Sequence, residues 1–257
     1  MEFSIPIHDN KRLAQIMERV RNSTRLQVLW ECSNINALNR LNLNDHGPVH
    51  IKIITNIALK LLRLLIERGV VPSVVESHNL EVADAEVIVV LASLLHDIGH
   101  AIHRDQHEEM SVVLAPPLIA ELIKNIYTDS ACTIIESEVL HAIFSHRRAV
   151  LPFTVEAGVV KIADALDMEK GRARIPFTAG APTIHSVSAI AITKVKLSPG
   201  KSKPVRIEVR MANSAGIFQL DNLLKEKLQR SGIAQYFEVI AEIRGEEKKI
   251  VEQYVIE

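Results

Sequence analysis

An adjacent histidine and aspartate, His96 and Asp97, directly follow a strongly apolar stretch at residues 87–95. A carboxylate and an imidazole at the end of an apolar helix are costly to bury unless another group satisfies both. A divalent metal ion would do so, because carboxylate oxygens and imidazole nitrogens are common metal ligands. A helix C-terminus offers another explanation, since a histidine there interacts favourably with the negative end of the helix dipole. The pair alone leaves both interpretations open.

Further residues favour the metal interpretation. His50 lies in the first turns of an expected helix at 48–68, and Asp164 is a carboxylate within another apolar helix. With the histidine–aspartate pair, these side chains could converge from three helices of one bundle, and bundle cores are recurring metal sites. Two histidines on other expected helices, His107 and His146, could complete an adjacent site.

The segments that must position these residues read as helices up to about residue 180. Pro48 suits the first turn of a helix, and Gly69 suits the residue that follows one. Asp84 is expected to cap a helix, and Pro116 and Pro117 to break or kink one. The helix at 48–68 has a broad apolar surface and is expected to be central. Apolar residues at helical spacing predict helices at 10–21, 24–41, 48–68, 85–98, 106–127, 136–146 and 155–168.

The pattern changes after a Gly- and Arg-containing segment at 171–180, which we interpret as a linker. Alternating residues predict strands at 187–197 and 205–211, an amphipathic helix at 217–230, and strands at 237–243 and 249–255 that could form a hairpin. The predicted fold class is therefore α+β, with an all-α bundle at 1–180 followed by a small ββαββ module at 181–257. The module is expected to dimerise, sense a ligand or cover the active site.

Taken together, these motifs resemble the HD-domain superfamily of metal-dependent phosphohydrolases over about residues 50–174. The histidine–aspartate pair resembles the doublet that defines the family. Segment 140–146 is similar to an element of the diadenosine-tetraphosphate hydrolase branch, and segment 161–164 to the closing motif that supplies the last aspartate. The resemblance implies a helical HD-type bundle in which Asp97 bridges two metal ions. The metal ligands that it implies are His50, His96, Asp97, His107, His146 and Asp164.

The subfamily is left open by the sequence. Segment 96–100 resembles the deoxynucleotide triphosphohydrolase branch, but residues 101–104 do not continue the pattern of that branch. The GYP motif of related cyclic-di-GMP phosphodiesterases is absent from the sequence. The substrate is therefore expected to be a small phosphorylated molecule, preferably a nucleotide, without a more specific identity.

Phosphoryl transfer needs cations that offset charge on the phosphoryl oxygens. An ordinary solvated linker is an equally good explanation for the arginines at 171–174. Asp167 shares a helix face with Asp164 and could orient a ligand histidine. His141 points about 140° away from His146 on an ideal helix, which separates it from that ligand. The candidate catalytic residues are Asp97, His100, Lys161 and Arg172, and the candidate substrate-binding residues are His103, Arg104 and Arg174.

The predicted function is a metal-dependent phosphohydrolase that cleaves a phosphate ester or anhydride. Mixed histidine and carboxylate ligands favour a divalent transition metal over calcium. We expect two ions, with Fe or Mn preferred and Zn, Co or Ni as the other choices. The alternatives are a metal-holding nucleotide sensor without turnover and a diiron HD-type oxygenase.

Composition limits the partners. The chain has 257 residues, 47% of them hydrophobic, and a formal net charge of −1, which predicts a globular protein without a general attraction to nucleic acid. The N-terminal residues lack the features of a signal peptide, and no apolar run is long enough to span a membrane. Cys32 and Cys132 suggest no disulfide framework. We therefore expect a cytoplasmic enzyme with no membrane partner, which could be a homodimer.

Overall fold

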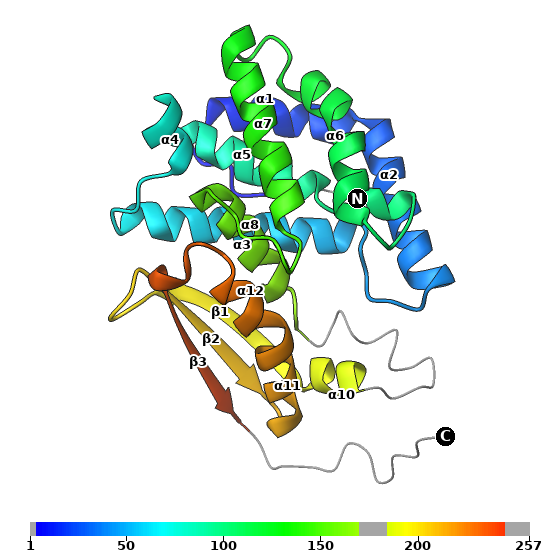
Figure 1. Ribbon diagram of the computed structural model, residues 1–257, viewed down its shortest axis with the longest axis vertical. Helices are drawn as coiled ribbons and strands as arrows, with labels where there is room; N and C mark the ends of the chain where they lie inside the picture. The colour runs from blue at the N-terminus through cyan, green and yellow to red at the C-terminus, as the bar shows by residue number, and fades with distance from the viewer. Residues whose placement is uncertain (1–3, 170–183, 245–257) are drawn as a thin grey trace.

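The computed structural model describes residues 4–169 and 184–244 (Figure 1). A helical bundle comes first in the chain, and a small sheet with its own helices lies on one side of it. The bundle contains α1 (Lys11–Asn22), α2 (Thr24–Asn34), α3 (Pro48–Glu67), α4 (Ser73–His78), α5 (Val82–Leu95), α6 (His107–Ile123), α7 (Asp129–Ser145) and α8 (Val155–Leu166). A π-helical turn, η1 (Ile35–Arg40), follows α2, and a short 3-10 turn, η2 (Ile98–Ala101), follows α5.

Helix α5 forms the centre of the bundle. Every residue from 84 to 95 except Glu86 is buried, and α5 packs against α3, α7 and α8. A helix that is apolar on all sides is stable only where neighbours enclose it. Helix α3, which was expected to be central, packs against α5 and α8 as well, and it leaves Ile53 39% exposed.

Two local expectations about helix ends and breaks are also corrected. Helix α5 begins earlier than predicted because Glu81 caps it, and Asp84 completes a reciprocal capping box from inside the first turn. Helix α6 continues through Pro116 and Pro117 without a break. The carbonyl group of Val113, which Pro117 leaves without its helical donor, belongs to a residue that is 69% exposed, so water can bind it.

The small module contains a three-stranded sheet in the described residues, with the order β1-β2-β3. β1 (Ile192–Pro199) pairs antiparallel with β2 (Val205–Met211), and β2 pairs parallel with β3 (Phe237–Ile243). A parallel pair needs a crossover connection. The helical crossover consists of η3 (Ser214–Gly216), α11 (Ile217–Gln219), the π-helical turn η4 (Leu220–Lys225), α12 (Glu226–Gln229) and η5 (Ala234–Tyr236).

The α+β fold class is confirmed, with two differences in the module. The first strand begins at Ile192 and not at Val187, because the preceding residues belong to helix α10 (Ile184–Ala191). Strand β3, which was predicted to form a hairpin with a strand at 249–255, pairs with β2 in parallel orientation. The predicted hairpin strand at 249–255 and the predicted linker at 171–180 lie outside the described residues.

The sheet and its helices pack on the lower side of the bundle as drawn in Figure 1. β1 and β2 contact α3, and η4 and α12 contact α8. None of the helices in the described ranges combines the length and the apolar character needed to cross a bilayer.

Candidate metal centre

The histidine–aspartate pair lies where α5 ends, and side chains of α2 hold that end of the helix. Trp30 Nε1 donates a 2.8 Å hydrogen bond to the Leu94 carbonyl oxygen. Ser33 Oγ lies 3.3 Å from the carbonyl oxygen of Asp97. The pair is thereby fixed inside the bundle, where His96 is fully buried and Asp97 is 4% exposed.

The turn after the pair brings helix α6 into close contact. The Gly99 amide donates to Ser111 Oγ at 2.8 Å, and Ser111 Oγ donates to the His96 carbonyl oxygen at 2.7 Å. A Cβ atom at position 99 would lie 2.0 Å from the His107 carbonyl oxygen, so only glycine fits. The glycine and the small serine thus place His107, the first residue of α6, beside the pair.

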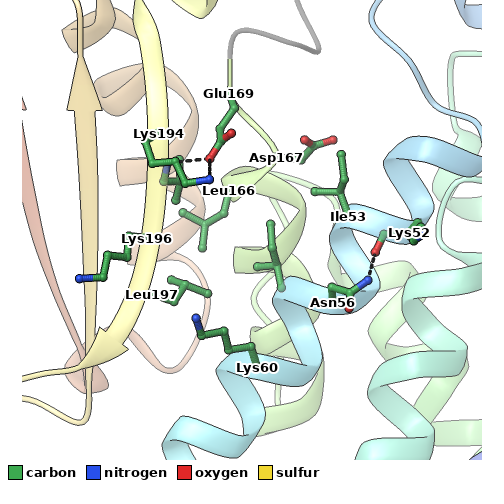
Figure 2. A pocket seen from close by; sticks show the side chains of 12 residues that line it. Lys52, Ile53, Asn56, Lys60, Leu166, Asp167, Glu169, Lys194, Lys196 and Leu197 are labelled. Carbon is green, nitrogen blue, oxygen red and sulfur yellow. Dashed lines mark hydrogen bonds and ion pairs between the residues drawn. The ribbon is translucent and has the colours of Figure 1, made fainter. Parts of the chain in front are cut away.

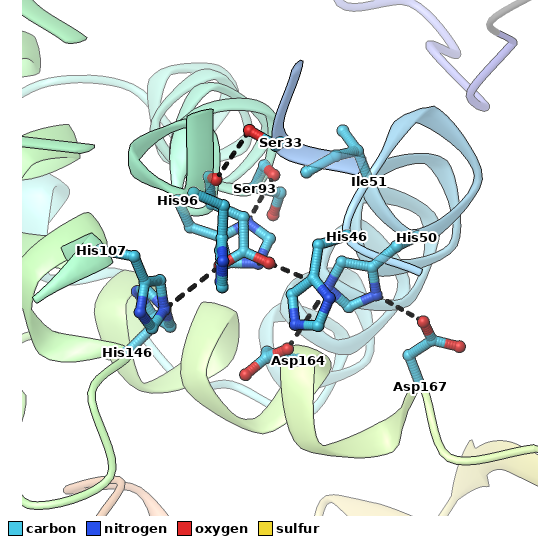
Figure 3. A network of polar contacts seen from close by, with 12 residues as sticks. Ser33, His46, His50, Ile51, Ser93, His96, His107, His146, Asp164 and Asp167 are labelled. Carbon is cyan, nitrogen blue, oxygen red and sulfur yellow. Dashed lines mark hydrogen bonds and ion pairs between the residues drawn. The ribbon is translucent and has the colours of Figure 1, made fainter. Parts of the chain in front are cut away.

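The Asp97 carboxylate lies between two groups of histidines. Its Oδ2 atom is 3.4 Å from Nε2 of His50 and 3.4 Å from Nε2 of His96. Its Oδ1 atom is 3.4 Å from Nε2 of His107 and 3.7 Å from Nε2 of His146. Each group, together with Asp97, could hold a metal ion, because its ligand atoms lie within 4.8 Å of one another. Figure 3 shows His107 and His146 on one side of His96, and His50 on the other.

In each of these histidines the other ring nitrogen, Nδ1, faces a hydrogen-bond acceptor. A carbonyl oxygen can only accept, so Nδ1 carries a proton and the Nε2 atom is directed at the cluster. Metal-binding histidines are oriented in this way. The acceptors are carbonyl oxygens of Ser93 for His96 (2.9 Å), Arg104 for His107 (3.0 Å) and Ile143 for His146 (2.5 Å), and the Asp167 carboxylate for His50 (2.5 Å).

The buried Nε2 atom of His96 tests whether this donor set fits a metal ion. It makes no hydrogen bond with any group in the described part of the chain, although it is 3.4 Å from Asp97. A buried polar atom without a hydrogen bond is costly, and a coordinated ion would remove that cost. Imidazole and carboxylate donors suit a divalent transition metal. The residues present therefore fit a metal centre.

Electrostatics keep the two carboxylates ionised. Burial alone would raise the pKa of Asp97, but the neighbouring His96 and His50 hold it well below its usual range. Burial also opposes ionisation of Asp164, and Lys227 and His96 hold the pKa of that carboxyl well below its usual range. Both carboxylates are thus in the state that a metal ligand requires.

The histidines differ in their charge. Burial, with help from His96 and His107, holds the pKa of His146 well below its usual range. Burial also lowers the pKa of His100 to about 3, against the attraction of Asp97. For His96, burial disfavours the charged form, but Asp97 outweighs it and raises the pKa. A proton and a metal ion are alternatives at His96 Nε2, so metal binding would release that proton.

Asp164 lies at the edge of the cluster and contacts the small module. Its Oδ1 atom is 3.6 Å from His50 Nε2, and its Oδ2 atom forms an ion pair with Lys227 of α12. Lys227 was not among the predicted site residues, none of which lies in the module. The sequence holds no signal for it, because Lys227 resembles any other charged residue on the polar side of an amphipathic helix.

The structure adds a third histidine group. His100, a predicted catalytic residue, could hold a metal ion together with His46 and Asp97. Its Nε2 atom is 3.8 Å from Asp97 Oδ1 and 3.0 Å from Nη1 of Arg104, a predicted substrate-binding residue. His46, which was not a predicted site residue, lies in the turn before α3, and its ring is 4.5 Å from that of His100.

Lys161, also a predicted catalytic residue, directs its ammonium group to backbone carbonyl oxygens next to His146. It is fully buried, and its ammonium donates to carbonyl oxygens at the end of α7 and in the loop that follows, including those of Ser145 at 3.3 Å and Arg147 at 2.7 Å. These two residues flank His146. The position of Lys161 indicates a role in holding this loop.

Two further histidines, His103 and His141, bind backbone amides in the described part of the chain. His103 is exposed, and its Nδ1 atom accepts a hydrogen bond from the Asp105 amide. His141 faces the loop after α7, where its Nε2 atom accepts a hydrogen bond from the Phe153 amide. Arg172 and Arg174 lie outside the described residues.

Comparison with known proteins places the same region in a known sequence family. Residues 52–169 match the sequence model of the HD domain. The chain is also 40% identical over 241 residues to the uncharacterized protein MJ1020 of Methanocaldococcus jannaschii. This similarity covers 94% of the chain and 93% of the relative, so it includes the small module as well as the bundle.

Proposed function

This chain belongs to the HD-domain superfamily, and on that premise we propose that it is a metal-dependent phosphohydrolase. The proposed reaction is cleavage of a phosphate ester or anhydride, with a nucleotide as the substrate. The observation that carries the proposal is the position of Asp97, whose two oxygens face separate groups of histidine Nε2 atoms. Such an arrangement can hold two cations next to each other, as phosphoryl-transfer sites do.

Two divalent ions in these places would draw charge from phosphoryl oxygens and lower the pKa of an attacking water. His50, His96 and Asp164 would hold one ion, His107 and His146 the other, and Asp97 would contact both. Fe or Mn is preferred, with Zn, Co or Ni as the other choices.

The chain supplies the remaining requirements of the reaction. Asp97, which is ionised, or a nearby histidine would guide the proton of the attacking water. Lys227 and Arg104 lie at the edge of the cluster and can offset charge on the phosphoryl oxygens. Lys161 would act as a positioning residue through the loop that carries His146. His100, His103, Arg172 and Arg174 stay proposed participants in catalysis or phosphate contact.

The small module is proposed to complete the active site. We divide the chain into a catalytic domain at 1–180 and a module at 181–257, and the Lys227–Asp164 ion pair supports a role for the module in substrate binding. We also propose a cytoplasmic protein without membrane or nucleic-acid partners. We also propose that the protein can form a homodimer.

A phosphate-release screen tests the function. Protein loaded with Mn or Fe is assayed against nucleoside mono-, di- and triphosphates, dinucleoside polyphosphates and cyclic dinucleotides. We expect hydrolysis of at least one class, loss of activity and metal in Asp97→Ala, and lower turnover with unchanged metal in Arg172→Ala. Hydrolysis that survives Asp97→Ala would place the chemistry elsewhere. Tight binding without hydrolysis would favour the sensor alternative, and oxygen consumption would favour the oxygenase.

A variant of Lys227 tests the contribution of the module. Lys227→Met keeps the length of the side chain and removes its charge, so KM should rise about tenfold or more, while bound metal does not fall. Lys225→Met is the matched control, because Lys225 is an exposed lysine of the same crossover that pairs with Asp221 and not with Asp164 among the described residues. Equal KM values for the two variants would remove Lys227 from the substrate site.

A further inference from the structure

A cavity of about 530 Å³ lies between α3 of the bundle and β1 of the module, next to the end of α8 (Figure 2). Its volume falls within the range of about 300–1,000 Å³ that is usual for small-molecule sites. Bundle and module each supply one wall, so the cavity exists only in the assembled chain.

The lining of the cavity combines an apolar surface with excess positive charge. The apolar part includes Ile57 on α3, Leu166 at the end of α8, and Val195 and Leu197 on β1. The lining residues include four lysines and two carboxylates, and one of the lysines, Lys196, pairs with Glu208 outside the lining at 3.7 Å. A ligand with an apolar body and negative charge would match both features.

Two of these lysines are available to an anion. Lys60 makes no ion pair with any described residue, and Figure 2 shows its side chain extending from α3 toward β1. Lys194 lies 3.5 Å from Glu169, but both side chains are well exposed, at 61% and 41%. Exposed ion pairs contribute little free energy, so an anion can compete with Glu169 for Lys194.

The cavity is separated from the metal cluster by Asp167. This carboxylate lines the cavity and accepts the hydrogen bond from His50 Nδ1 at 2.5 Å. The opposite ring nitrogen, Nε2, faces Asp97. A ligand in the cavity would therefore lie behind a metal-ligand histidine, and not on the side where phosphoryl transfer is proposed.

We propose that this cavity is a second binding site, which takes a phosphorylated organic molecule of nucleotide size. Its phosphate would contact Lys60 and Lys194, and its apolar part would pack on Ile57 and Leu197. Binding at this cavity requires neither hydrolysis nor metal. A test of binding here is therefore independent of the proposed function.

Calorimetric titration of the EDTA-treated full-length protein tests the site. The probe is the nonhydrolysable nucleotide AMP-PNP, and inorganic pyrophosphate serves to isolate the phosphate contribution. We expect AMP-PNP to bind, pyrophosphate to bind about tenfold more weakly or worse, and Lys60→Glu to weaken AMP-PNP about tenfold or more. Val195→Trp, which fills the cavity without changing charge, should also weaken binding, with folding checked by circular dichroism.

Two control variants locate the binding. Lys11→Glu makes the same charge change at an exposed residue of α1, and Asp97→Asn alters the metal cluster. Both should bind AMP-PNP as the unaltered chain does. The proposal is overturned if no binding occurs up to about 1 mM AMP-PNP, if Lys60→Glu binds like Lys11→Glu, or if only Asp97→Asn weakens binding.

Discussion

At the scale of single residues, the two ring nitrogens of His50 face different carboxylates. Nδ1 is 2.5 Å from Asp167, whereas Nε2 is 3.4 Å from Asp97 and 3.6 Å from Asp164. A carboxylate behind a histidine fixes the tautomer and raises the basicity of the nitrogen that binds a metal. Asp167 is therefore expected to act on metal binding without touching the ion.

Removal of Asp167 should weaken metal binding. In Asp167→Ala the His50 ring loses its acceptor, and we expect metal affinity to fall about 10–100-fold. The measurement is a competitive titration of Mn or Zn against a chelator. Glu169→Ala is the control, since it removes a nearby carboxylate that pairs with Lys194 and not with a histidine. Equal metal affinities of Asp167→Ala and Glu169→Ala would contradict the proposal that Asp167 supports metal binding through His50.

At the scale of elements, a buried ammonium joins α7 to α8. Lys161 of α8 donates to the carbonyl oxygens of Ser145, Arg147, Arg148 and Val150. The last carbonyl groups of a helix have no partner within it, and Lys161 satisfies such a group at the end of α7. The same contacts set the position of His146, which lies within the loop.

Replacement of Lys161 should affect stability and one part of the metal cluster. Lys161→Met leaves buried carbonyl groups without a donor, which costs about 1–3 kcal/mol of unfolding free energy. Because His146 loses its support, elemental analysis should find less metal per chain, with the His50–His96 group still occupied. Urea unfolding measures the stability. Lys124→Met, at an exposed lysine after α6, should change neither quantity. An unchanged metal content in Lys161→Met would show that Lys161 is not needed to position His146.

At the scale of the whole molecule, bundle and module meet at α8. A Cβ atom at Gly158 would lie 2.5 Å from the Ser231 carbonyl oxygen and 2.9 Å from Ile233 Cγ1. Nearby, Arg148 of the bundle pairs with Glu226 of α12. This ion pair and the packing at Gly158 together hold α12 close to the bundle. Lys227 reaches Asp164 only because this approach is close.

Gly158→Ala should therefore separate the two parts. Alanine in a helix is normally more stable than glycine by about 1 kcal/mol, so a lower stability here would come from the interface contact. We expect a net loss of about 1–3 kcal/mol from overpacking, measured by thermal unfolding, and a higher KM because Lys227 moves. Ser137→Ala on the exposed side of α7 is the control. A thermal midpoint at or above that of the unaltered chain would contradict the close contact.

The sequence by itself determined the features that depend on local order. Strands at 205–211 and 237–243 coincide with β2 and β3, because alternation of apolar and charged residues repeats over a few neighbours. The chemistry of His96 and Asp97 also follows from residue type, since an imidazole and a carboxylate in an apolar setting need a partner. Family membership followed from the order of such motifs along the chain.

Only the tertiary structure decided which distant side chains meet. His46 lies in the cluster, Lys161 binds carbonyl oxygens next to His146, and Lys227 of the module pairs with Asp164. The parallel pairing of β2 with β3 and the cavity between α3 and β1 were likewise outside the reach of sequence patterns. Periodicity reports which face of an element is buried, but the neighbour of that face depends on how all the elements pack together. The sequence around a single lysine on a helix therefore does not indicate which carboxylate that lysine will contact.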